Sequence, residues 1–341
     1  MIDVTNLPKA ELHMHIEGSL EPEMMLRLAR RNDVEIPFAT PDEVAAACEF
    51  KDLQSFLNLF YAGLTVMRTA RDFAGVTYAY MERAHADRVR RAELYLSPQA
   101  HLRRGVAVDT LMEGVREALE AARADFGISG AVIWGLQRQF PEAEAMETLD
   151  ALKGHEDIVV ALGMGGPERG NPPSKFRNVY AEARARGLRT TIHAGEEGDA
   201  SYVREALELL QVDRIDHGVR AEEDDSLVAE LVRRRMTLTV CPLSNVRLRV
   251  FDRIEDHNLA RLLRRDVRVT VNSDDPSYFG GYVNANFHAC QHALALSDAE
   301  ILRLVRNSFT GAFLPQDEIN VHLAELDRVI AEQQGGTHHH F

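Results

Sequence analysis

The stretch Leu12-His13-Met14-His15-Ile16-Glu17-Gly18 contains most of the first predicted strand and the two residues after it. Side chains alternate between the two faces of a β-strand, so His13 and His15 point to the same side. Two imidazoles held close together on one face suit a zinc-class divalent ion. The same spacing also occurs among ordinary polar residues of half-buried strands, so the choice between the two interpretations depends on the rest of the chain.

The composition is that of an acidic globular protein. The 341 residues are 45% hydrophobic and 27% charged, which is ordinary for a folded chain. This length allows one barrel-sized domain or two smaller ones, and we expect a single domain over residues 1–341. The formal net charge of −14 argues against nucleic-acid and anionic-membrane partners, because either would require a basic patch.

Cysteine usage and the lack of targeting patterns indicate the compartment. Cys48, Cys241 and Cys290 are widely spaced and form no CxxC pair, which is typical of a reducing compartment without a disulfide framework. The sequence shows neither a signal-peptide pattern at its start nor an apolar run long enough to span a bilayer. We therefore expect a cytoplasmic protein.

Short apolar runs alternate with helical patterns along the chain. Eight runs predict strands, at residues 11–16, 92–97, 131–136, 158–163, 189–194, 214–217, 237–241 and 267–272. Several are β-branched and nearly all-apolar, which fits a parallel sheet covered on both faces. Eight strands alternating with helices predict a (β/α)8 TIM barrel, a fold that often associates into homo-oligomers. A doubly wound open sheet is the alternative, but no GxGxxG turn follows the first strand.

Helix starts are predicted from capping patterns. Apolar residues recur every four positions from Leu111 to Leu119, and Thr110 with Glu113 predicts a capping box at the front of that helix. Ser297 begins a second predicted box of the same kind.

Two segments lie outside the regular alternation. Residues 21–73 have a helical pattern and predict an excursion after the first strand, placed as a lid or wall over the mouth of the barrel. Residues 315–341 predict a C-terminal helix and tail. The tail contains His338, His339 and His340, which indicate either a weak metal-binding stretch or part of a disordered end.

Ionisable residues gather at the predicted strand ends, where the active site of a TIM barrel lies. Strands one, five, six and eight carry them, at positions His13, His15, Glu17, His193, Glu196, His217, Asp274 and Asp275. Each residue alone could be an ordinary structural group. Four strands that place such groups at one end of the barrel favour a metal site.

Three histidines and one carboxylate form a suitable zinc shell with one position left for water. The candidate ligands are His13, His15, His193 and Asp274. The ion would lower the pKa of that water, and Glu196 and His217 remain to move protons, with Asp275 as a second acceptor. A two-metal hydrolase commonly needs a bridging carboxylate or modified lysine at strand four. Residues 158–166 contain neither, which favours one metal.

Five stretches occur in order between about residues 7 and 314. They are Leu7-Pro8-Lys9-Ala10-Glu11-Leu12-His13-Met14-His15, His193-Ala194-Gly195-Glu196, Asp216-His217-Gly218, Cys241-Pro242-Leu243-Ser244-Asn245 and Ser273-Asp274-Asp275-Pro276. Together they resemble the adenosine/adenine deaminases of the amidohydrolase superfamily.

The resemblance implies a role for each position. His13, His15, His193 and Asp274 would hold Zn²⁺, although the ligand set also admits another divalent metal such as Fe²⁺. Glu196 would protonate the purine N1 as hydroxide attacks C6, because this attack moves electron density onto N1. His217 would orient and deprotonate the water, assisted by Asp275, which is also expected near N7. Glu196 must be protonated to donate, so we expect burial and substrate to raise its pKa.

Glu17 bears on which purine is bound. In adenosine-type members this position is usually an Asp that contacts ribose, whereas residues 15–20 resemble the adenine-type branch, in which the longer Glu occupies ribose space. Residues 50–57 and 274–282 resemble the same branch. The alternative interpretation of Glu17 is a conservative surface replacement.

The loop after the fourth predicted strand departs from the family pattern. Adenine deaminases tend to have Gly-Leu-Asp-Ser-Ser-Glu-Arg-Gly there, whereas residues 163–170 are Gly-Met-Gly-Gly-Pro-Glu-Arg-Gly. Gly165 and Gly166 thus stand in place of Asp and Ser along the purine edge. Either the pocket is enlarged for a substituted purine, or the loop binds N3 through backbone N–H groups, which glycine preserves.

The sequence therefore predicts a zinc-dependent aminohydrolase that converts free adenine and water to hypoxanthine and ammonia. An N6-substituted or otherwise modified adenine and adenosine are the alternative substrates. A catalytically silent purine-binding relative is the alternative from another class. Such a relative would be expected to lack a metal ligand, Glu196 or His217, and this sequence has them all.

Overall fold

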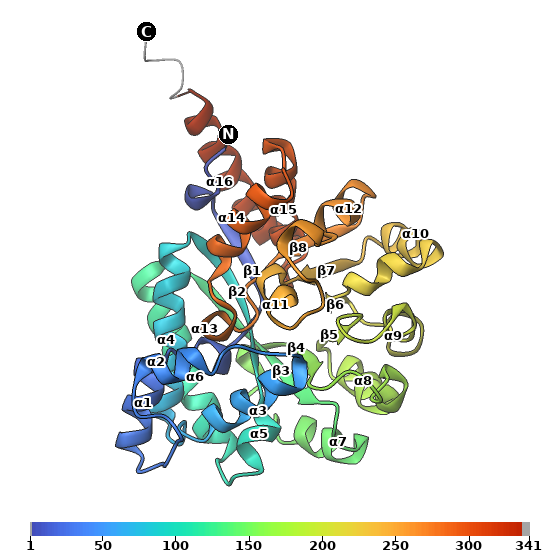
Figure 1. The fold of residues 1–341 in the computed structure, drawn as a ribbon. Helices are drawn as coiled ribbons and strands as arrows, with labels where there is room; N and C mark the ends of the chain where they lie inside the picture. Colours follow the sequence, from blue (N-terminus) through green and yellow to red (C-terminus); the bar gives the residue numbers. More distant parts are fainter. Residues whose placement is uncertain (1, 336–341) are drawn as a thin grey trace.

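The chain forms a ring of parallel strands surrounded by helices (Figure 1). The computed structural model describes residues 2–335. Within that range the sheet has eight parallel strands that pair in chain order, and Met14 bridges to Asp274 to join the last strand to the first. The strands are β1 (Lys9–His15), β2 (Val89–Leu96), β3 (Ser129–Gln137), β4 (Val159–Gly165), β5 (Arg189–Ala194), β6 (Arg214–His217), β7 (Thr237–Val240) and β8 (Arg268–Val271). This arrangement confirms the predicted TIM barrel.

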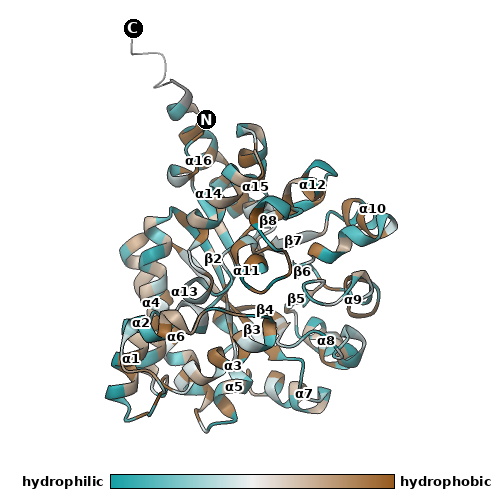
Figure 2. Cartoon of the chain, viewed as in Figure 1, coloured by the Kyte–Doolittle hydropathy of each residue, from teal (hydrophilic) through white to brown (hydrophobic). Residues whose placement is uncertain are grey.

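Helices between the strands cover the outside of the ring (Figure 1). They are α4 (Ala70–Ala86), α6 (Val108–Phe126), α7 (Glu142–Asp150), α8 (Arg177–Ala185), α9 (Ala200–Glu205), α10 (Asp225–Arg234), α12 (Leu259–Arg264) and α15 (Asp298–Thr310). Each mixes apolar and polar residues along its length (Figure 2). In α10, for example, Leu227, Val228 and Leu231 are buried, and burial of each such side chain stabilises the fold by about 1.5–3 kcal/mol.

The predicted helix starts had different outcomes. Ser297 accepts the backbone N–H of Glu300 at 3.3 Å, and the Glu300 carboxylate accepts that of Ser297 at 2.8 Å, so this capping box is confirmed. The box predicted at Thr110 is wrong. Helix α6 already begins at Val108, after Ala107, which has no side chain able to cap it. Thr110 therefore lies inside the first turn of the helix.

Three helices follow β1 before the ring helix α4. They are α1 (Pro22–Arg31), α2 (Pro41–Ala46) and α3 (Leu53–Leu64). Figure 1 draws them in blue, with α1 and α2 at the lower left and α3 closer to the centre of the ring. The predicted excursion over residues 21–73 thus overlaps the first turn of α4, which belongs to the ring. Helix α3 lines the cavity at the mouth of the barrel.

The remaining helices are α5 (Pro98–Leu102), α11 (Pro242–Arg247), α13 (Pro276–Phe279), α14 (Val283–Ala293) and α16 (Gln316–Gly335). The histidines at 338–340 lie outside the described residues. All three cysteines are buried and free. Among residues 2–335, no helix combines the length and apolar character needed to cross a membrane.

Candidate active site

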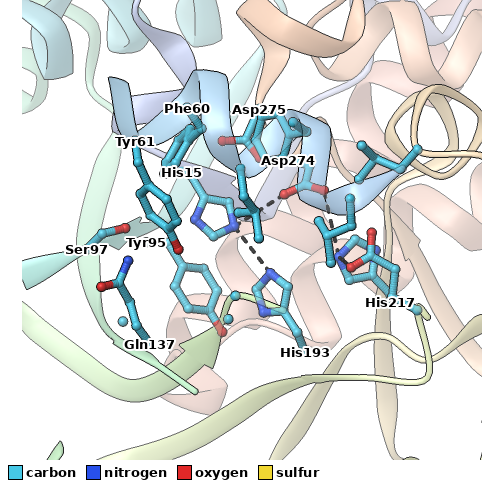
Figure 3. Close-up of a pocket in the computed structure, with 18 of the residues that line it drawn as sticks. His15, Phe60, Tyr61, Tyr95, Ser97, Gln137, His193, His217, Asp274 and Asp275 are labelled. Carbon is cyan, nitrogen blue, oxygen red and sulfur yellow. Dashed lines mark hydrogen bonds and ion pairs between the residues drawn. The ribbon is translucent and has the colours of Figure 1, made fainter. Parts of the chain in front are cut away.

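Four predicted ligands meet at the C-terminal end of the barrel. His13 and His15 lie on β1, His193 near the end of β5, and Asp274 directly after β8. The Nε2 atom of His193 lies 3.1 Å from that of His13 and 3.3 Å from that of His15. The Asp274 Oδ1 atom lies 3.4 Å from His13 Nε2 and 3.2 Å from His15 Nε2. Figure 3 shows His15, His193 and Asp274 facing a common centre.

The spacing of these atoms fits one tetrahedral zinc ion. Donor atoms that bind zinc at about 2.0–2.1 Å in a tetrahedron are about 3.3–3.4 Å apart, which matches the four separations. Burial, reinforced by His13 and His217, holds the pKa of His193 well below its usual range, so this imidazole is neutral. Metal binding requires the neutral form. The four residues therefore form a candidate metal site.

The buried carboxylate of Asp216 helps to orient the metal-site histidine His13. Asp216 accepts hydrogen bonds from the hydroxyls of Tyr95, Thr191 and Thr239. Thr239 Oγ1 donates to Asp216, so it is an acceptor for the Nδ1–H of His13 at 3.1 Å. The proton on Nδ1 leaves the lone pair of Nε2 facing the site. Partners of this kind commonly fix the orientation of metal-binding imidazoles.

The backbone is strained at two of the strand ends. His217, the last residue of β6, and Asp274, which follows β8, have φ angles of +61° and +63°. Non-glycine residues seldom adopt this conformation, which costs about 1–3 kcal/mol and persists where the surroundings hold it. Asp274 is held by a hydrogen bond from the Ser244 hydroxyl to Oδ2 at 2.7 Å. Its backbone also pairs with β1, where its carbonyl accepts the N–H of His15 at 2.8 Å.

His217 and Glu196 lie beside the ligand cluster. His217 Nε2 is 3.5 Å from Glu196 Oε2 and 3.7 Å from Asp274 Oδ2. Burial is the main cause that raises the pKa of Glu196 well above its usual range, and the Asp274 and Glu168 carboxylates add to it. Within the described chain, neither Glu196 Oε1 nor His217 Nε2 has a hydrogen-bond partner. Buried polar atoms of this kind are available to a ligand.

The turn that carries Glu196 is clamped by Glu168, which follows β4. The Glu168 carboxylate accepts the backbone N–H groups of Gly195 at 2.6 Å, Glu196 at 3.0 Å and Glu197 at 2.8 Å. Arg138 lies in the same region and donates from Nη1 to the carbonyl oxygen of His193 at 2.5 Å. These contacts hold the proton-donor candidate at a fixed position relative to the ligands.

A cavity opens above the cluster between the strand ends and α3 (Figure 3). Its apolar wall consists of Leu53, Phe56, Leu57, Phe60 and Leu248. Polar side chains line it on the other sides, among them Tyr61, Ser97, Gln137, Glu196, His217 and Asp275. A mostly apolar cleft with a few placed polar groups is typical of a site for a small planar molecule.

The chain as a whole matches known deaminases. The family model described as adenosine deaminase matches residues 8–329. The adenine deaminase of Sphingopyxis alaskensis is 53% identical over 324 residues, which is 95% of each chain. This chain belongs to the adenosine deaminase family. The crystal structure of an adenine deaminase from Arthrobacter aurescens superposes with a TM-score of 0.93 at 46% identity, over 95% of this chain and 99% of that one.

A more distant structure of the same fold was determined with bound zinc. This amidohydrolase from Burkholderia ambifaria has a TM-score of 0.89 at 26% identity, over 98% of this chain and 96% of its own. Membership of the adenosine deaminase family accounts for the shared barrel and for the order of the motifs along the chain.

Glu17, predicted to contact the substrate, is placed behind the cavity wall in this family member. It lies in the 3₁₀ turn Glu17–Ser19 and is fully buried. Its Oε1 atom accepts the N–H of Ser97 at 2.8 Å and lies 2.9 Å from His101 Nε2. Its second oxygen, Oε2, has no partner among the described residues. Glu17 is thus connected to the cavity by its hydrogen bond with Ser97, which lines the cavity.

Gly165 and Gly166 line the cavity. A Cβ atom on Gly165 would lie 3.5–3.7 Å from the imidazole of His193, an ordinary contact distance. Gly166 has a φ of +92°, and a Cβ atom there would lie 2.6 Å from Oε1 of Gln139. A Cβ atom therefore fits at Gly165 in contact with His193, whereas Gln139 occupies the space at Gly166.

Several site residues were missed from the sequence. Glu168, Ser244, Asn245 and Asp216 stand in the quoted loop or motifs, but their types and spacing did not show what they contact. Tyr95 stacks on His15 with ring centroids 4.7 Å apart and an interplanar angle of 21°. Its position at the end of the second predicted strand is the one signal that could have identified it.

Proposed function

We propose that this chain hydrolyses free adenine to hypoxanthine and ammonia, with Zn²⁺ held by His13, His15, His193 and Asp274. The observation that carries the proposal is the convergence of these ligands, Glu196 and His217 on one cavity. When bound, the ion supplies Lewis-acid activation of water. Another divalent metal such as Fe²⁺ is the alternative, because the ligand set admits it.

Each protein group has a proposed task in this reaction. Glu196 protonates N1 as the water oxygen bonds to C6, because the electrons of the C6–N1 double bond move to N1. His217 holds the attacking water, and His217 or Asp275 takes its proton. The same proton then passes to the amine as the C6–N6 bond breaks and ammonia leaves. The C6 hydroxyl gives its remaining proton back to Glu196 and becomes the carbonyl of hypoxanthine. The raised pKa of Glu196 supports its task as a donor.

The relatives named adenine deaminase support a free base over a nucleoside. We propose that Glu17 contributes to this preference by fixing Ser97 at the cavity wall. We also propose that Asp275 faces the purine with its Oδ1 atom, which has no hydrogen-bond partner among the described residues. An N6-substituted adenine is the second candidate substrate, because Gly165 leaves side-chain space open beside His193. We propose a cytoplasmic enzyme that associates into a homo-oligomer, as barrels of this kind often do, and that has neither nucleic-acid nor membrane partners, in keeping with its charge of −14.

The test compares turnover of adenine, N6-methyladenine and adenosine by the purified, zinc-loaded chain, followed by ultraviolet absorbance. We expect the highest kcat/KM for adenine and the lowest for adenosine. Preference for N6-methyladenine would favour the second candidate, and preference for adenosine would contradict the role proposed for Glu17. Full zinc loading without turnover of any of the three would indicate a silent purine-binding relative.

A further inference from the structure

A chain of hydrogen bonds leads to His217 from the start of helix α12. The backbone N–H of Leu259 donates to Nδ1 of His257 at 3.0 Å. A backbone N–H can only donate, so Nδ1 of His257 carries the lone pair of that ring. His257 is 1% exposed, and burial lowers its pKa to about 3, so the ring is neutral and its proton lies on Nε2.

The side-chain amide of Asn245, on α11, links His257 to His217 by hydrogen bonds. The Nε2–H of His257 faces the Oδ1 atom of Asn245 at 3.2 Å. Because this interaction assigns the amide oxygen to the His257 side, the amide nitrogen faces His217, where it donates to Nδ1 at 3.2 Å. Nδ1 of His217 is therefore an acceptor. In the neutral ring the proton must then lie on Nε2.

Burial and hydrogen bonds fix the orientation of both relay residues. Asn245 is fully buried, and its backbone carbonyl accepts the N–H groups of Val250 at 2.8 Å and Phe251 at 3.1 Å. The Phe251 ring packs on His257 with centroids 4.4 Å apart. A flipped His257 ring would present a C–H group to the Leu259 N–H and leave that donor unpaired, at a cost of about 1–3 kcal/mol.

We propose that His257 and Asn245 are positioning residues that hold His217 in the Nε2–H tautomer, so that His217 donates a hydrogen bond to the attacking water and does not take its proton. The inference rests on the proposed function for the identity of the water. It deepens that function by deciding whether His217 or Asp275 takes the proton of the water. A ring with its proton on Nε2 has no lone pair toward the cavity and cannot take it. A carboxylate of the site is then the acceptor.

The surroundings of His217 Nε2 agree with a donor. The atom faces the carboxylates of Glu196 at 3.5 Å and Asp274 at 3.7 Å. Across the described residues it has no hydrogen-bond partner, and His217 lines the cavity. A lone pair in that position would face the Asp274 carboxylate and be repelled by it, whereas an N–H is attracted to that carboxylate and to the oxygen of a water beside it.

The test reads the tautomer directly by nitrogen NMR of the full chain labelled with ¹⁵N in its histidine rings. The metal-free and zinc-loaded proteins are both measured, and a His217→Gln variant identifies the His217 signals. We expect the proton on Nε2 in both forms. A His217 proton on Nδ1 in the wild-type spectrum would overturn the proposal, whatever the substrate proves to be.

Asn245→Asp replaces the amide nitrogen that faces His217 by an oxygen, with little change of shape. An ionised carboxylate can only accept hydrogen bonds, so it would accept from both histidines. We expect the His217 proton to move to Nδ1 and kcat to fall about 10–100-fold, as for other outer partners of catalytic groups. An unchanged tautomer in this variant would contradict the relay. His257→Leu serves if Asn245→Asp does not fold, and should give a mixture of the two tautomers.

Phe251→Leu is the matched control. It loosens the packing on His257 and leaves the hydrogen bonds of the relay in place. We expect an unchanged tautomer and a kcat within about twofold of the wild type. If this control slows turnover as much as His257→Leu does without moving the proton, the kinetic effect comes from packing, and the relay has no role in catalysis. Inactivity toward adenine with the expected tautomer would instead concern the proposed function alone.

Discussion

The carboxylate of Glu168 accepts the backbone N–H of Glu196 at 3.0 Å. It also accepts the N–H groups of Gly195 and Glu197, so one side chain after β4 satisfies three consecutive donors after β5. A turn held in this way keeps the Glu196 carboxyl in place.

Glu168→Gln should therefore affect both stability and turnover. The amide has a single acceptor oxygen and turns an N–H group toward other donors, which leaves at least one buried N–H unpaired at a cost of about 1–3 kcal/mol. We expect urea denaturation to show a loss of that size and kcat to fall. Glu147→Gln, on the exposed side of α7, is the control and should change neither. Wild-type stability of the Glu168 variant would show that the clamp is energetically unimportant.

Glu196→Gln should remove the proton donor and keep the site intact. General acid catalysis is worth about 10²–10⁴-fold, so we expect kcat to fall by that factor while zinc content and purine affinity stay near wild type. Glu197→Gln changes the neighbouring residue, whose side chain lies outside the cavity lining, and should have little effect. Near-normal turnover of Glu196→Gln would remove Glu196 from the mechanism.

The pH dependence of kcat/KM follows from the same residue. Burial raises the pKa of Glu196 well above its usual range. The protonated, donating form is therefore present below that raised pKa and is lost as the pH increases through it. We expect an alkaline limb in the profile of the wild type that is absent from Glu196→Gln. If both proteins show the same alkaline limb, it belongs to another group.

Asp274→Ala should reduce metal content itself. The variant removes one of four converging ligands and leaves His13 and His15 without their carboxylate partner. We expect zinc affinity to fall by at least about 100-fold, the upper end of what the loss of an outer partner costs. Metal analysis after dialysis measures this. Asp275→Asn is the control, because it should keep zinc while turnover falls, and full zinc occupancy of Asp274→Ala would count against its role as a ligand.

Gly165 and Gly166 should respond differently to substitution. Gly165→Ala places a Cβ atom at ordinary contact distance from His193, so we expect a change in stability below about 1 kcal/mol. Gly166→Ala forces alanine to a φ of +92° against Gln139 and should cost about 1–2 kcal/mol. Thermal denaturation compares the pair. Gly165→Asp should lower kcat/KM for N6-methyladenine more than for adenine, and an equal effect would show that the open space does not select the substrate.

The sequence by itself determined the barrel and which side chains gather at the candidate metal site. Eight apolar runs alternating with helical patterns predict a parallel ring, because strands covered on both faces must be apolar throughout. The alternation of side chains along β1 places His13 and His15 together. Strand ends of a barrel share one face, so His193 and Asp274 follow without knowledge of any contact.

Tertiary structure alone decided how those groups are held. Glu168 meets the turn of Glu196, and His257 meets His217 through Asn245, between segments that follow neighbouring strands of the barrel. Local pattern also misplaced the start of α6, which begins at Val108, before Thr110. Composition and spacing report which residues a chain has and which face they share. The direction of a hydrogen bond depends on side-chain orientation across distant segments, which no local pattern encodes.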